Sequence, residues 1–222
     1  MKKRERLGDA RSPDGTEMTL WRHDGDYTIR VGAVELMSTR RHHSEDALAE
    51  LACAPLRDRA GVRVLIGGLG LGFTLRAALR LLPADARVVV AELVEEIVEW
   101  NRTYELADDA LRDPRVELRH ADVADVLRAS RGEFDAILLD VDNGPDALTS
   151  SGNAQLYRAT GIAAAVAALR KGGRLAYWSS SDDPEFAESL RDAGLTVETT
   201  RVRAHVTAGP MHTLLVAQRA TD

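Results

Sequence analysis

The chain has a single cysteine, Cys53, no long apolar run and no excess of basic residues. One cysteine excludes an internal disulfide and a cysteine-rich zinc site, and its apolar helical neighbours predict a buried, inert thiol. No apolar stretch approaches the roughly twenty residues of a transmembrane helix, and the charged start of the chain lacks the apolar segment of a signal peptide. We therefore expect a cytoplasmic protein.

The formal net charge is −6, and the 29 Lys and Arg residues are interspersed with 35 Asp and Glu residues. A nucleic-acid groove needs a basic stripe, so this balance favours a small-molecule partner over nucleic acid or a membrane. A length of 222 residues with 45% hydrophobic content suits one well-buried domain and an appendage.

The most informative segment runs from Arg63 to Phe73, where a buried-strand pattern leads into a glycine-rich turn and then into a helical pattern. Glycines let the backbone turn sharply and lie close to a ligand, and the helix that follows offers free N–H groups. The next strand ends in Glu92, about twenty residues on, at a position where a carboxylate can accept hydrogen bonds from the two ribose hydroxyls. Together they predict an adenosine-containing cofactor bound by the glycines Gly67, Gly68, Gly70 and Gly72.

The spacing of this turn decides between cofactors. The dinucleotide fingerprint is G-x-G-x-x-G, whereas here Phe73 stands where the third glycine should fall. The spacing therefore favours S-adenosylmethionine over NAD. A tight strand-to-helix turn of an ordinary α/β protein is the alternative interpretation.

From residue 61 onward strands and helices alternate, which predicts a mostly parallel sheet covered by helices. The last two strands follow each other directly and should pair as an antiparallel hairpin. This order predicts an α/β, Rossmann-like class I methyltransferase fold with a seven-stranded sheet, and residues 61–222 as its catalytic domain. The expected strands are 63–67, 87–92, 115–119, 135–140, 173–179, 195–201 and 212–218, and the helices 74–82, 94–103, 123–129, 155–170 and 184–193.

Residues 1–60 predict a small N-terminal β appendage. Short alternating strands are expected at 17–22, 26–31 and 33–37, followed by a helix from Ser44 to Ala54 with Ser44 as its N-cap. Too small to hold a core alone, the appendage should pack near the cofactor mouth, either on the main domain or on a partner subunit in a homodimer. The first dozen residues are expected to be mobile.

Ligands of open α/β sheets lie beyond the carboxyl ends of the strands, so residues there are the candidates for chemistry. Asp122 can accept from an adenine amino group while Val123 lies against the ring, and Asp122 equally suits the N-cap of the next helix. Asp140 ends a buried apolar strand and needs a cationic or N–H partner, which makes it the candidate catalytic residue.

The loops beyond these strands offer further candidates. Asp142 and Asn143 could contact the acceptor or serve the turn, and we expect no metal because the sequence nominates no further oxygen ligands for an Asp140/Asp142 pair. His42 and His43 could form a lid over the acceptor or an exposed joint. We favour core packing over an acceptor pocket for two aromatic residues, and structural roles for two hairpin histidines: Tyr157, Trp178, His205 and His212.

These segments resemble the spermidine synthase-like branch of the class I S-adenosylmethionine-dependent methyltransferase superfamily. The resemblance covers Val64 to Gly72, Ala91 to Val94, Ala121-Asp122 and Phe134 to Asp140. It implies that the glycine turn holds the thioether part of the cofactor. It also implies ribose binding by Glu92, adenine binding by Asp122 and assistance to an attacking amine by Asp140.

The chain departs from that pattern where aminopropyltransferases carry acids. Gly70 replaces the Asp of G-G-G-D-G, Asn143 replaces the second acid of D-x-x-D-P, and the Tyr and Gln of the connecting helix become apolar around Ala47 and Leu48. A dicationic amine needs several carboxylates. We therefore expect a methyltransferase that acts on a small-molecule amine or oxygen nucleophile. The alternatives are an aminopropyl or 3-amino-3-carboxypropyl transferase and a non-catalytic scaffold.

Overall fold

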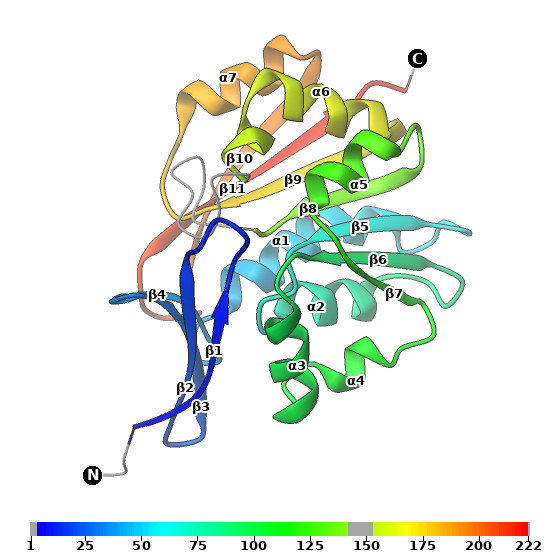
Figure 1. The fold of residues 1–222 in the computed structure, drawn as a ribbon. Coiled ribbons are helices and arrows are strands. Elements are labelled where there is room, and N and C mark those ends of the chain that lie inside the picture. Colours follow the sequence, from blue (N-terminus) through cyan, green and yellow to red (C-terminus); the bar gives the residue numbers. More distant parts are fainter. Residues whose placement is uncertain (1–3, 142–152, 222) are drawn as a thin grey trace.

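A seven-stranded sheet runs through the molecule, with helices on both faces (Figure 1). The computed structural model describes residues 4–141 and 153–221. The strand order is β10-β11-β9-β8-β5-β6-β7. Strands β9, β8, β5, β6 and β7 are parallel, and β11 lies antiparallel between β9 and β10, which confirms the predicted sheet and terminal hairpin. The strands are β5 (Arg63–Gly67), β6 (Arg87–Glu92), β7 (Val116–His120), β8 (Phe134–Leu139), β9 (Leu169–Ser179), β10 (Leu195–Arg203) and β11 (Met211–Arg219).

The central strands are apolar throughout because both faces of the sheet are buried. Side chains alternate between two apolar clusters, so that Val64 and Ile66 belong to one and Leu65 to the other. The first cluster includes residues of α1 (His43–Cys53), α2 (Phe73–Leu81), α3 (Glu95–Thr103) and α4 (Asp108–Leu111). The second includes residues of α5 (Val123–Ala129), α6 (Ala159–Ala168) and α7 (Pro184–Asp192). Cys53 is buried in the first cluster, as expected.

The N-terminal appendage is a separate four-stranded antiparallel sheet beside the central one (Figure 1). It consists of β1 (Glu5–Arg11), β2 (Glu17–His23), β3 (Asp26–Val31) and β4 (Val34–Ser38). Its inward residues Met18, Leu20 and Ile29 join the first apolar cluster, and the Tyr104 hydroxyl donates to the Leu7 carbonyl. The appendage therefore packs on the main domain.

Three local predictions are wrong. Residues 5–11 form β1, which pairs with β2 from Glu5 to Arg11, so this part of the first dozen residues is ordered. The helix expected over 155–170 is divided into the short 3₁₀ turn η2 (Asn153–Tyr157) and α6, because Arg158 between them is extended. That helix ends at Ala168 since Leu169 already pairs with Phe134 in the sheet.

The helix α1 begins at His43 and continues through Cys53 into the 3₁₀ turn η1 (Ala54–Leu56). Its N-cap is His42, not Ser44 as predicted. The Ser44 side chain is buried and bonds to other side chains, which removes it from the capping position.

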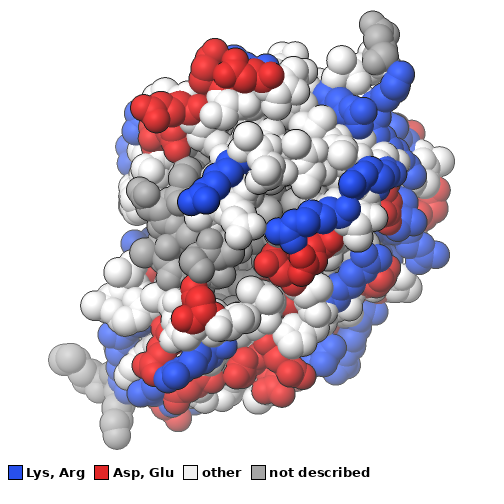
Figure 2. Space-filling model, turned by 45° about the horizontal axis from the view of Figure 1, so that its top comes forward, with Lys and Arg blue, Asp and Glu red and all other residues white. Residues whose placement is uncertain are grey.

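Basic and acidic side chains are interspersed over much of the face in Figure 2, in keeping with the balanced sequence. Within residues 4–141 and 153–221, no helix is long and apolar enough to cross a membrane.

Candidate active site

The glycine turn after β5 forms one side of a pocket. Gly68 and Gly70 line this pocket and have φ angles of +87° and +51°, a left-handed region that favours glycine. A Cβ at Gly68 would lie 2.4 Å from the Asp140 carbonyl oxygen, and one at Gly70 would lie 2.7 Å from the Met37 sulfur. Glycine is therefore required at position 68, where the clash is with backbone, whereas at position 70 a side chain would have to displace the Met37 side chain.

The other two predicted glycines have a packing role. A Cβ at Gly67 would lie 2.8 Å from a Val123 methyl group, and one at Gly72 would lie 2.3 Å from the Ala107 Cβ. Neither glycine is among the residues lining the pocket. Because they lack a side chain, β5 can lie close to α5 and the turn can lie close to the start of α4. These two glycines therefore shape the turn without lining the pocket.

Glu92 ends β6 with its carboxylate inside the pocket. One carboxylate oxygen accepts the Leu69 N–H at 2.8 Å, and the other accepts the Val94 N–H at 2.9 Å. Burial raises the pKa of Glu92, and these backbone N–H groups oppose the rise. Each oxygen keeps a lone pair for a further donor, so the carboxylate can accept from two vicinal hydroxyl groups.

Asp122 and Val123 lie at the same edge of the sheet and also line the pocket. The Asp122 carboxylate accepts the Ala124 N–H at 2.8 Å and caps α5. Capping uses one oxygen, which leaves the other for a ligand. The two interpretations of Asp122 are therefore compatible in this geometry.

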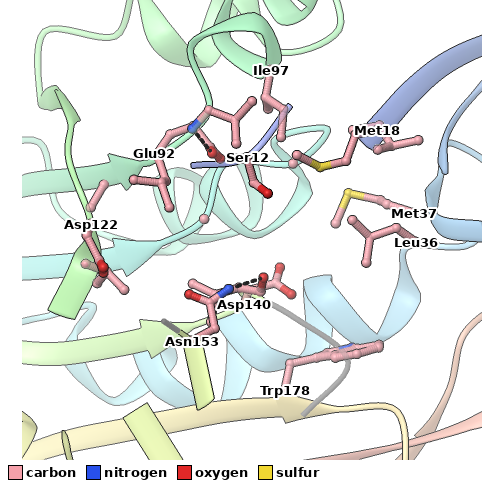
Figure 3. Close-up of a pocket in the computed structure, with 18 of the residues that line it drawn as sticks. Ser12, Met18, Leu36, Met37, Glu92, Ile97, Asp122, Asp140, Asn153 and Trp178 are labelled. Atoms are coloured by element: carbon pink, nitrogen blue, oxygen red, sulfur yellow. Dashed lines mark hydrogen bonds between the residues drawn. The ribbon is translucent and has the colours of Figure 1, made fainter. Parts of the chain in front are cut away.

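The appendage supplies the opposite wall of the pocket. Figure 3 shows Met18, Leu36 and Met37 facing the edge of the central sheet that carries Asp140 and Trp178. The pocket holds about 830 Å³, including the space at its open mouth. The Met37 sulfur also accepts the Leu71 N–H at 3.0 Å, which fixes the appendage to the glycine turn.

Two further carboxyl groups line the pocket and, like Glu92 and Asp122, have no basic partner in any described ion pair. Asp140 follows β8 and accepts the Thr74 hydroxyl at 2.7 Å, while Glu45 projects from the first turn of α1 and is 5% exposed. Burial, and next the negative charge of Asp140, raise the pKa of Glu45 to about 8. Burial raises the pKa of Asp140 to about 6, although the Thr74 hydrogen bond opposes this.

Such a pair of acids is costly to ionise in a protein interior, and a cationic ligand would remove the cost. Neither Glu45 nor Thr74 was predicted from the sequence as a pocket residue. The signal for Glu45 is an acid that falls on the buried face of α1 with Leu48, Ala49 and Ala52.

The remaining candidates are dispersed. His42 stacks on Phe73 with ring centroids 4.2 Å apart, and the His43 N–H donates to the Ala204 carbonyl. Neither histidine is among the pocket-lining residues, whereas Glu45, two positions further on, is. Asp142 and Asn143 lie outside the described residues.

The two aromatic candidates have different surroundings. Trp178 is buried in the first apolar cluster, as expected, and it also lines the pocket. Tyr157 instead packs in the second apolar cluster, with its ring centroid 5.0 Å from that of Phe186, as expected.

No protein-family model matches the chain. A polyamine aminopropyltransferase from Thermococcus onnurineus is 39% identical over 79 residues, which are 35% of this chain and 28% of the relative. A spermidine synthase crystallised with the transition-state analogue AdoDATO superposes on 98% of this chain and 74% of its own, with 20% identity and a TM-score of 0.78. The spermidine synthase from Thermotoga maritima gives 18% identity and a TM-score of 0.73 over 98% of this chain and 73% of its own.

These comparisons correct two predictions. The preference for a methyltransferase is wrong, because the relatives are an aminopropyltransferase and spermidine synthases. The prediction of S-adenosylmethionine as a cofactor is wrong with it, since aminopropyl transfer consumes decarboxylated S-adenosylmethionine as a substrate. The alternative, an aminopropyltransferase-type enzyme, agrees better with the relatives.

The aligned segment spans less than a third of the curated relative, and the solved structures share at most a fifth of their residues with this chain. What the superpositions establish at these identities is the fold. The chain is spermidine synthase-like in fold, as the motifs around its glycine turn predicted.

Proposed function

We propose that this protein is an aminopropyltransferase that moves the aminopropyl group of decarboxylated S-adenosylmethionine to a small-molecule amine. The observation that carries the proposal is a pair of carboxyl groups, the buried Glu45 and the half-buried Asp140, in the pocket that also holds Glu92 and the glycine turn. In this proposal residues 61–222 bind the donor, and residues 1–60 cover it and supply Glu45.

The nucleoside part of the donor would lie along the edge formed by β5, β6 and β7. Glu92 would accept from both ribose hydroxyls, Asp122 from the adenine amino group, and Val123 would lie against the ring. The support is their common position on one pocket wall and the free lone pairs of both acids. Gly68 and Gly70 would let the backbone approach the thioether part.

The resemblance implies an acid at the position of Gly70, where it would pair with the cationic part of the donor. Here the Met37 sulfur occupies the space beside Gly70. Glu45, which lines the same pocket from α1, would offer an acid to the ammonium of the acceptor. An ammonium group between Glu45 and Asp140 would favour their ionised forms and reverse the rise of their pKa values.

The reaction is a displacement at the carbon that joins the aminopropyl group to the sulfonium. The acceptor ammonium first gives a proton to the Asp140 carboxylate, and the free amine then forms the new C–N bond. The C–S bond breaks with its electron pair going to sulfur, which leaves neutral methylthioadenosine. Alignment and exclusion of water supply most of the rate, and Asp140 supplies the base.

Calorimetry with the two forms of the donor tests the proposal. Decarboxylated S-adenosylmethionine should bind at least ten-fold more tightly than S-adenosylmethionine, because the extra carboxylate of the intact form would face the Glu45 and Asp140 carboxyl groups. Equal binding of the two forms, or tighter binding of the intact one, would overturn the proposal.

A further inference from the structure

A chain of hydrogen bonds links Glu45 to the terminal hairpin. The Ser44 hydroxyl donates to a Glu45 carboxylate oxygen at 2.6 Å, and the same hydroxyl lies 2.9 Å from Nδ1 of His212 on β11. Ser44 is fully buried. The chain thus connects the first turn of α1 to a strand 168 positions away in the sequence.

The direction of this chain follows from the proton count. A hydroxyl has one proton, so when Ser44 donates it to the ionised Glu45 carboxylate, the Ser44 oxygen accepts from His212. His212 therefore carries its proton on Nδ1. Burial, and next the positive charge of Arg41, lower the pKa of His212 to about 4, so the imidazole is neutral and a fixed donor near pH 7.

The same imidazole touches a second wall of the pocket. The rings of His212 and Trp178 meet edge to face, with centroids 4.5 Å apart and an angle of 65° between their planes. Trp178 is 7% exposed and lines the pocket below Met37 and Leu36 in Figure 3. His212 therefore contacts, directly or through Ser44, two side chains that shape the pocket.

We propose that Ser44 and His212 are positioning residues for the acceptor amine, which hold the Glu45 carboxylate at one wall of the pocket and the Trp178 ring at another. The inference rests on the proposed function and deepens it, because it assigns ammonium recognition to Glu45. It also gives the terminal hairpin a role in substrate selection. Neither residue touches the reacting atoms; both act through Glu45 and Trp178.

Steady-state kinetics with 1,4-diaminobutane as the probe acceptor tests the inference. His212→Leu and Ser44→Ala should each raise the KM for the diamine about ten-fold and leave donor affinity within about two-fold, since the loss is that of one hydrogen bond to a charged group. His212→Asn should recover most of the wild-type KM, because its amide can donate from nearly the same place. His205→Leu, in the exposed turn of the same hairpin, is the matched control.

A carboxyl titration by NMR of Glu45 gives a readout that needs no turnover. The Ser44 hydrogen bond lowers the pKa of Glu45, so Ser44→Ala should raise it further, with the neighbouring charges of Asp140 and Asp46 unchanged. An unchanged titration together with an unchanged KM in stable variants would overturn the inference. A shifted titration in a protein that transfers nothing to the diamine would support the positioning role and refute the proposed function.

Discussion

Replacing Glu45 by Gln should stabilise the protein increasingly as the pH rises. The folded-state pKa of Glu45 is raised to about 8 from an ordinary value of 4.5. Between these values the folded protein holds a proton that the unfolded chain has lost, so the free energy of unfolding falls as the pH rises through the folded pKa. From pH 6 to pH 8 this single group should lower it by about 2 kcal/mol.

Two other groups titrate in the pocket, and their signs differ. The pKa of Asp140 is raised to about 6, so this group lowers the free energy of unfolding as the pH rises toward 6, mostly below this window. The pKa of His212 is lowered to about 4, so this group lowers the free energy of unfolding as the pH falls from 6.5 toward 4. Near pH 6 its pH dependence is therefore slightly opposite in sign to that of Glu45. Both are present in wild type and variant, so the difference between the two reports Glu45 together with its coupling to Asp140.

Urea unfolding at pH 6, 7 and 8 measures this difference. The stability of Glu45→Gln relative to wild type should increase by about 2 kcal/mol across the series. Glu50→Gln changes an exposed acid of the same helix and should show no such trend. Parallel curves for wild type and Glu45→Gln would refute the placement of Glu45 as a buried, protonated acid.

Three further substitutions test the rest of the pocket. Glu92→Ala should weaken donor binding at least ten-fold by calorimetry and cost about 2 kcal/mol of stability, because the Leu69 and Val94 N–H groups lose their acceptor; unchanged donor affinity would contradict its ribose role. Asp140→Asn should lower kcat by ~10²–10⁴-fold with little change in donor affinity, and normal turnover would remove it as the base. Gly68→Ala should lower the melting temperature by several degrees through strain of about 2 kcal/mol, and an unchanged melting temperature would show that the turn tolerates a side chain.

The features that could be predicted from the sequence are those set by residues close together in the chain. The alternation of strands and helices, the glycine turn and the carboxylate at the end of β6 are local patterns, and the parallel sheet follows from them. Asp122 as an N-cap is equally local, since the capped N–H lies two residues on. Even the placement of the appendage near the pocket followed from its being too small to fold alone.

The acceptor side of the pocket could not be predicted in the same way. Glu45 lies at the pocket because α1 packs beside β8 and β9, and His212, which bonds to the Ser44 hydroxyl next to Glu45, is 168 positions from Ser44. Gly70 and Asn143 stand where the family pattern has acids, and the Tyr and Gln of the connecting helix are missing around Ala47 and Leu48, which suggested that polyamine-binding acids were depleted. That argument favoured methyl transfer, which the relatives contradict, and in our proposal the compensating acid, Glu45, stands earlier in the same helix.

The most direct test of aminopropyl transfer is mass spectrometry of the products formed from decarboxylated S-adenosylmethionine labelled in its aminopropyl group. With 1,4-diaminobutane as acceptor, the proposal predicts that the label moves to the diamine as an added aminopropyl group and that methylthioadenosine is released in equal amount. A diamine that gains a methyl group instead, or a bound donor that transfers nothing to any amine offered, would contradict the account.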